Sequence, residues 1–171
     1  ESRILMVEAQ KSKVPFLEKI KKQYPATDYS ISLLSSNDGT EKYFCENETA
    51  SHVTSLPEKG LHCHLIESIS LDTLLKQKEF PLPDLLKLDV QGHELEVLKG
   101  ASVALSHAEI CLMEITLMDI GDGCPLLLEM LNFMDSMRFE AYDISQFIRR
   151  PYDKALFKVD RLLVKKNSPL M

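Results

Sequence analysis

Five polar residues stand at or beside the ends of apolar, strand-like runs, where side chains are free for chemistry; they are Glu8, Ser35, Ser36, Asp89 and Glu114. Ligands of parallel α/β sheets bind beyond the carboxyl ends of the strands, so these positions are the first candidates for a site. Glu8 follows the apolar run 4–7. Its carboxylate has two acceptor oxygens that match the two donors of a ribose diol. The alternative for Glu8 is a solvated acid at a strand end.

Strand-like and helix-like segments alternate along the chain, and this alternation must position those residues. Alternating or continuous apolar residues predict strands over 4–7, 29–33, 61–69, 85–90, 110–115, 139–142 and 159–164, with a short run at 41–45. Apolar residues at helical spacing predict helices over 13–24 with Ser12 as N-cap, over 71–77, from Gly92 to Gly100, and from Pro125 to Met134. Residues 46–60 are polar and read as a loop. This order predicts one α/β domain, residues 1–171, with a mostly parallel sheet.

Composition narrows the class of protein. The chain has 171 residues, 44% of them hydrophobic and 27% charged, which is typical of a globular domain. A net charge of -6 argues against nucleic acid as a partner. No apolar run reaches the roughly 18 residues that a membrane-spanning helix needs.

The spacing of the cysteines and histidines is not typical of a metal site. The four cysteines, which are Cys45, Cys63, Cys111 and Cys124, lie far apart without a CxxC pair. Reduced thiols and a cytoplasmic location are the simpler expectation. His62 and His64 share one face of a strand, but the sequence indicates no third ligand near them. We therefore expect no metal site.

The segment LLKLDVQGHELEVLKGA, residues 85–101, is the most informative stretch. It resembles the motif of the FkbM-type family of S-adenosylmethionine-dependent methyltransferases, K-x-D-V-E-G-x-E followed by L-x-V-L-K-G-A. The matching residues are Lys87, Asp89, Val90, Gly92, Glu94, Leu95, Val97, Leu98, Lys99, Gly100 and Ala101. Residues 7–20, 33–40, 70–75 and 112–115 resemble further family segments in the same order, so the resemblance runs over almost the whole chain.

The resemblance also has departures. Gln91 stands where the family usually has Glu, Ala9-Gln10 replaces the common Glu-Pro, and Ser36 stands where an acid is frequent. The family's glycine-rich cofactor turn, D-x-G-A-x-x-G, has no counterpart here. If Glu8 ends the family's second strand, the first strand and its glycine loop precede residue 1.

The resemblance implies a Rossmann-like methyltransferase sheet of order 3-2-1-4-5-7-6 with an antiparallel last strand. By this resemblance we expect an N-terminally incomplete domain that lacks the first strand, so the second and fourth strands should each expose an unpaired edge.

The resemblance further implies S-adenosylmethionine as cofactor and a methyl acceptor oxygen on a sugar or small-metabolite hydroxyl. It places the cofactor against Glu8, Ala9, Ser35, Ser36 and Asp89. A neutral hydroxyl is a poor nucleophile, so a base helps, and His93, Glu94 and Glu114 are the candidates.

Each of these groups also has a plainer interpretation. His93 could be a solvated helix histidine, and Glu94 a first-turn acid favoured by the helix dipole. Lys87 could form a buried ion pair with Asp89 or Glu114. For the whole chain, the first alternative is a non-catalytic methyltransferase-like remnant or interaction module. A weaker second alternative is an NAD-dependent Rossmann enzyme, although no GxGxxG motif is present.

Overall fold

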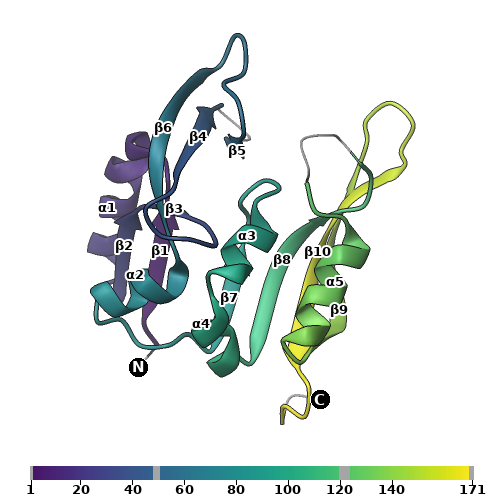
Figure 1. Ribbon diagram of the computed structural model, residues 1–171. Helices are drawn as coiled ribbons and strands as arrows, with labels where there is room; N and C mark the ends of the chain where they lie inside the picture. Colours follow the sequence, from purple (N-terminus) through teal and green to yellow (C-terminus); the bar gives the residue numbers. More distant parts are fainter. Residues whose placement is uncertain (1, 48–50, 120–123, 170–171) are drawn as a thin grey trace.

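The computed structural model describes residues 2–47, 51–119 and 124–169, which form an α/β fold with mixed sheets (Figure 1). Its strands pair in three groups within those ranges: β1-β2, β7-β8-β10-β9 and β3-β6-β4-β5. No helix of the described part is long and apolar enough to cross a membrane.

The first group is a parallel pair, β1 (Ile4–Glu8) and β2 (Thr27–Ile31), joined by the short turn η1 (Lys11–Lys13) and helix α1 (Val14–Gln23). The prediction of Ser12 as N-cap is wrong, because Ser12 lies inside η1. The N-cap is Lys13, and the helix begins at Val14. Pro15 fits the first helical turn, where its missing N–H costs no bond.

The second group holds most of the core. Its strands are β7 (Leu85–Leu88), β8 (Ile110–Thr116), β10 (Leu156–Lys165) and β9 (Phe139–Arg149). Helices α3 (Glu94–Lys99), α4 (Ser102–His107) and α5 (Leu127–Ser136) accompany these strands. Met113 on β8, Met134 on α5 and Leu163 on β10 are almost fully buried, so these elements share one hydrophobic core.

Part of the third group rises away from the rest of the molecule in Figure 1. It contains β3 (Leu33–Leu34), β4 (Glu41–Glu46), β5 (His52–Thr54) and β6 (His62–Ile69), and helix α2 (Leu71–Gln77) follows it. We call β4, β5 and the first half of β6 the arm. The strand β5 lies within residues 46–60, which the polar sequence there predicted as a loop.

The parallel pairs are β1–β2, β3–β6 and β7–β8, whereas β4–β5, β4–β6, β8–β10 and β9–β10 are antiparallel. As expected for the last strand, β10 runs antiparallel to β8. The expectation of a mostly parallel sheet is too simple, because the arm and the long β9–β10 pair add antiparallel ladders.

A disulfide corrects the expectation of four reduced cysteines. Cys45 on β4 and Cys63 on β6 are directly opposite each other in the ladder, with Cα atoms 4.0 Å apart, and form a disulfide. Their separation of 18 residues hides this pairing in the sequence, because it depends on the register of two strands. Cys111 and Cys124 are free thiols, as expected.

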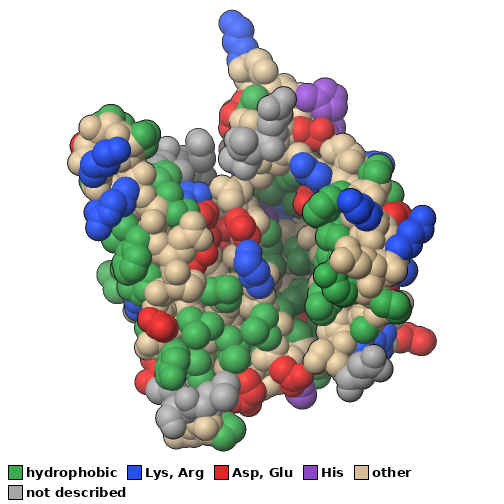
Figure 2. Space-filling view, turned by 180° about the vertical axis from the view of Figure 1, so that it is seen from behind, with side chains coloured by type: hydrophobic (Ala, Val, Ile, Leu, Met, Phe, Trp, Pro, Cys, Tyr) green, Lys and Arg blue, Asp and Glu red, His purple; other side chains and the backbone are tan. Residues whose placement is uncertain are grey.

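A groove of about 820 Å³ separates β1 from β7. Within the described residues, β1 pairs with β2 alone and β7 pairs with β8 alone. Leu5 on β1 and Leu86 and Leu88 on β7 contribute to its apolar walls. Figure 2 shows this hollow from behind, with hydrophobic side chains along it. Two strand edges therefore face each other across an apolar gap.

Candidate active site

A cavity of about 320 Å³ lies where β1 and β7 end. The segment after β1 contributes Glu8, Ala9 and Gln10 to its wall, and the segment after β7 contributes Asp89 and His93. The arm and Ser51 just before it add a third wall, to which Phe44, His52 and Val53 contribute. The site therefore forms at the carboxyl ends of two strands, where an α/β fold is expected to bind ligands.

The carboxylate of Glu8 is held in place by its own chain. The backbone N–H of Gln10 donates to Oε1 of Glu8 over 2.9 Å. Within the described residues Oε2 of Glu8 accepts no hydrogen bond, so this oxygen is open to a donor in the cavity. A half-buried carboxylate with one oxygen fixed and the other open suits the recognition of hydroxyl groups.

The turn between β7 and α3 depends on a glycine and on a carboxylate that folds back. Gly92 has a φ of 96°, which a residue with a side chain rarely adopts. The backbone N–H groups of Val90 and Gly92 each donate to the Glu94 carboxylate over 3.0 Å. Burial raises the pKa of Glu94, and these N–H donors oppose that rise. Glu94 thus shapes the turn that carries Asp89 and His93, and it does not line the cavity.

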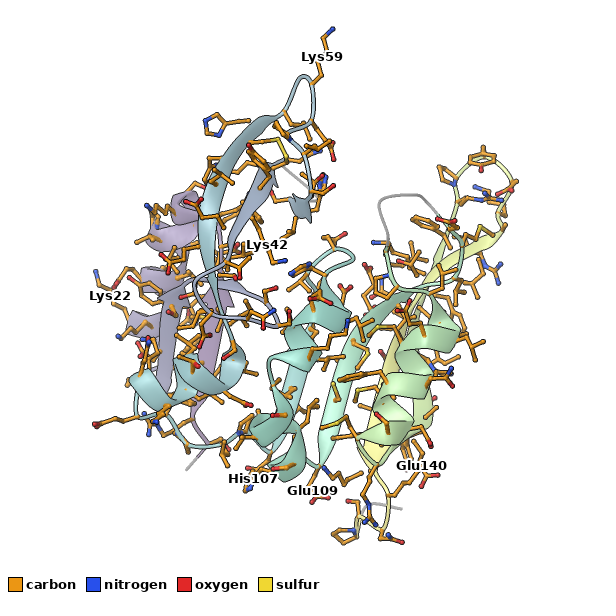
Figure 3. All side chains as sticks on the ribbon, in the orientation of Figure 1. Lys22, Lys42, Lys59, His107, Glu109 and Glu140 are labelled. Atoms are coloured by element: carbon orange, nitrogen blue, oxygen red, sulfur yellow. A yellow bond between two sulfur atoms is a disulfide. The ribbon has the colours of Figure 1, made fainter. Side chains whose placement is uncertain are left out.

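His93 is neutral at physiological pH in this setting. Its pKa is lowered to about 4, first because the ring is buried and then because of the positive charge of Lys42, while Glu96 acts in the opposite direction. Figure 3 shows Lys42 on β4, on the side of the arm that faces α3. Nε2 of His93 lies 3.1 Å from Oγ of Ser35, which fixes the orientation of the ring.

Ser35 and Ser36 act on α3 and do not line the cavity. Ser35 is fully buried behind His93. The hydroxyl of Ser36 donates to Oε2 of Glu96 over 2.6 Å, and Lys99 donates to the other oxygen of the same carboxylate. These two serines therefore fix α3 against the end of β3, at a distance from any cavity ligand.

A chain of polar contacts runs from the cavity to β8. Nε2 of Gln91 donates to Asp89 over 2.9 Å, and Oε1 of Gln91 accepts from Nζ of Lys158 over 3.1 Å. Lys158 also pairs with Glu114 at 2.6 Å, and both of these side chains are only 13% exposed. Gln91 is thus a neutral link between an acid at the cavity and a buried ion pair.

Lys87 pairs with Asp89, one of the two partners considered, but the pair is not buried. Lys87 lies 3.4 Å from Asp89, and both side chains are more than half exposed, so this contact is a surface pair. Glu114 takes Lys158 as its partner because β10 lies next to β8. Glu114 also lies inside β8 and not at its end.

The structure brings together four of the predicted site residues, Glu8, Ala9, Asp89 and His93, and leaves Ser35, Ser36, Glu94 and Glu114 outside the cavity wall. Sequence reasoning missed the contribution of the arm, because residues 46–60 carry no pattern that ties them to β1. It also missed Lys158, whose role depends on the register between β10 and β8.

Known proteins show similarity at three levels. Over 50 residues the chain is 48% identical to the hexuronic acid methyltransferase AglP of Haloferax volcanii, a match that covers 29% of this chain and 21% of that protein. The fold is similar to the crystal structure of the methyltransferase FkbM from Methylobacillus flagellatus, with a TM-score of 0.57 and 17% identity, covering 93% of this chain and 36% of that chain. The chain thus spans well under half the length of both relatives.

The family match assigns the chain to a family. Residues 1–141 match the methyltransferase FkbM domain, and this range includes the cavity walls formed by the ends of β1 and β7 and by the arm. The structural similarity at 17% identity supports the same fold. The chain belongs to the FkbM methyltransferase family.

Proposed function

We propose that this methyltransferase uses S-adenosylmethionine and methylates a hydroxyl oxygen of a sugar or similar small metabolite. The observation that carries the proposal is the Glu8 carboxylate, fixed by the N–H of Gln10 with one oxygen open at a cavity of about 320 Å³. That volume lies at the lower end of the roughly 300–1,000 Å³ of small-ligand pockets. The residues present fit the ribose of this cofactor, because the open oxygen of Glu8 can accept from a hydroxyl of the diol.

Glu8, Ala9 and Asp89 would hold the cofactor, while Ser35 and Ser36 position α3 beside it. When bound, S-adenosylmethionine supplies an electrophilic methyl group. The protein then needs to exclude water, orient the acceptor and take up its proton. Phe44 and the rest of the arm close one side of the cavity and serve the first of these tasks.

His93 is our candidate for the proton acceptor among His93, Glu94 and Glu114. Its imidazole is neutral at physiological pH, and it lines the cavity. If Nε2–H donates to Oγ of Ser35, the lone pair lies on Nδ1, which would receive the proton of the acceptor hydroxyl. The Glu94 carboxylate is occupied by the turn and Glu114 by Lys158, so both fit positioning roles better.

A sugar acceptor is supported by the hexuronic acid methyltransferase among the relatives. A uronic acid is a sugar whose hydroxyl oxygens could accept a methyl group after losing a proton. The acceptor would be a uronic acid, either free or joined to other sugars, and both forms can be offered in a turnover assay.

The test is calorimetric titration of the full-length protein with S-adenosylmethionine. Glu8→Gln keeps the shape of the side chain but removes its charge, and should weaken binding roughly tenfold or more, since a hydrogen bond to a charged group contributes about 1.5–3 kcal/mol. Glu129→Gln on the exposed face of α5 is the matched control and should bind like the wild type. Equal affinities of Glu8→Gln and wild type would refute the assignment of Glu8.

Turnover separates an enzyme from a non-catalytic remnant. Formation of S-adenosylhomocysteine with uronic acid acceptors should fall in His93→Gln through kcat, with the affinity for S-adenosylmethionine kept. Cofactor binding without turnover on any sugar would favour the interaction module. The replacement of the family's usual Glu by Gln91 is consistent with that alternative.

We also propose that the groove between β1 and β7 takes up one more strand, parallel to both, which would complete a Rossmann-like sheet. Both strands run in the same direction, because the segments that follow Glu8 and Leu88 meet at one cavity. A strand there would pair with both open edges and cover apolar walls. Amide exchange of residues 4–8 and 85–88 should then be slow in the full-length protein, and exchange at the rate of an open edge would refute the proposal.

A further inference from the structure

Three metal-binding side chains gather on one face of the arm. Glu46 ends β4, and His62 and His64 lie at the start of β6. Glu46 is directly opposite His62 in the antiparallel ladder, and His64 is two residues further along β6, so all three side chains share a face. The register supplies the third ligand that the sequence did not reveal.

The distances within this cluster suit one ion. One ligand atom from each residue can be chosen so that all three lie within 4.8 Å of one another. Nε2 of His64 lies 3.9 Å from Oε1 of Glu46, which is too long for a hydrogen bond. Ligands of one tetrahedral Zn²⁺ lie about 3.4 Å apart, given bond lengths of about 2.1 Å. Small side-chain rotations therefore bring the three atoms to bonding distance.

The two ring nitrogens of His64 differ in their surroundings. Its Nδ1 is buried and has no hydrogen-bond partner in the described part of the chain. With Nδ1 enclosed, Nε2, which lies 3.9 Å from Oε1 of Glu46, is the nitrogen that would bind an ion. His62 is exposed, which gives an ion a path from solvent.

The arm holds these ligands in a fixed relation before any ion arrives. The disulfide between Cys45 and Cys63 lies on the opposite face, because these residues alternate with Glu46, His62 and His64 along their strands. It locks the register between β4 and β6 next to the cluster. The rings of Phe44 and His64 pack in a T-shaped arrangement with centroids 6.1 Å apart. Little ordering is left to oppose binding.

The geometry points to a binding site for a divalent transition-metal ion, best suited to Zn²⁺, formed by Glu46, His62 and His64. Two imidazole nitrogens and one carboxylate oxygen form a known Zn²⁺ ligand set, with water in the remaining position. The site lies outside the wall of the cavity around Glu8, and Phe44 touches both. A bound ion clamps β4 to β6 beside that cavity.

The test is a calorimetric titration of the tag-free, full-length protein with Zn²⁺ at neutral pH. We expect one ion per chain, and a weakening by roughly tenfold or more in His62→Ala and in Glu46→Gln, because each removes one of three ligands. The control is His107→Ala, a histidine at the opposite end of the molecule that lies 3.3 Å from Asp84 (Figure 3). It should bind Zn²⁺ like the wild type.

A second measurement guards against effects on folding. His62 is exposed, so His62→Ala should keep the circular dichroism spectrum and thermal transition of the wild type. Co²⁺ should show visible absorption bands of an ordered low-symmetry site in the wild type and lose them in His62→Ala. The proposal is overturned if the wild type releases no heat with millimolar Zn²⁺, or if His62→Ala binds Zn²⁺ as tightly as the wild type.

Discussion

Gly100 lies where the end of α3 comes closest to the chain after β3, and replacing it with Ala should be strongly destabilising. An added Cβ would lie 2.1 Å from the carbonyl oxygen of Ser35 and 3.1 Å from Cβ of Ser70. The φ of Gly100 is −86°, which any residue can adopt, so the cost comes from space alone. A comfortable contact for a carbon atom is about 3.5 Å, so the overlap with Ser35 exceeds an ångström.

Neither side of this contact can move freely. The carbonyl of Gly100 accepts from the N–H of Asp72 over 3.1 Å, and the N–H of Ser35 donates to Ile69 over 3.0 Å. Overpacking of this kind costs typically about 1–3 kcal/mol, and a clash with backbone belongs at the upper end, about 3 kcal/mol. A shift of α3 would also separate Ser35 from His93, so the variant should lose activity as well.

Urea unfolding followed by circular dichroism measures this cost. With a slope of about 2 kcal/mol per molar urea, the midpoint of Gly100→Ala should fall by about 1.5 M. The control is Gly60→Ala, where a Cβ meets open space but φ is 93°, so that only backbone strain of about 1–2 kcal/mol applies. A Gly100→Ala midpoint equal to that of the wild type would refute the close packing of α3.

Two further predictions concern charges. Lys158→Met leaves the largely buried Glu114 without its cation and should lower the free energy of unfolding in urea by about 3 kcal/mol. In the control Lys166→Met, the partner Asp135 is exposed, so the loss should be less than about 1 kcal/mol. Equal losses would contradict the role of the buried pair. The pKa of His93 falls from 6.5 to about 4 on folding, so the unfolded chain binds a proton that the folded chain does not. Stability should therefore drop between about pH 6.5 and pH 4 by up to about 3 kcal/mol, and His93→Gln should flatten that part of the profile.

Local patterns in the sequence predicted the elements that position the site. The apolar run before Asp89 and the helix that ends before Gly100 occur as expected, because each depends on neighbouring residues. The resemblance of residues 85–101 also pointed to the correct family. Elements set by local spacing are therefore readable without a structure.

Contacts that depend on the register between strands could not be predicted from the sequence. The disulfide of Cys45, the pairing of Glu114 with Lys158 and the approach of Glu46 to His62 all depend on how distant strands align. The lengths of β9 and β10 were also underestimated, because most β9 side chains are exposed and its apolar pattern fades beyond Tyr142. The alignment of strands that are distant in sequence is a long-range property that no local pattern records.

The groove between β1 and β7 has a consequence for local unfolding. In the part of the chain that the structure describes, no backbone ladder joins the pair β1–β2 to the sheet β7-β8-β10-β9. Without a ladder between them, β1, β2 and α1 should open at a lower free energy than the strands around Met113 and Leu163. Glu8 belongs to the weaker unit and His93 to the stronger one. A ligand that contacts both would stabilise the weaker unit by mass action, and its binding should appear as slower amide exchange in β1 and β2.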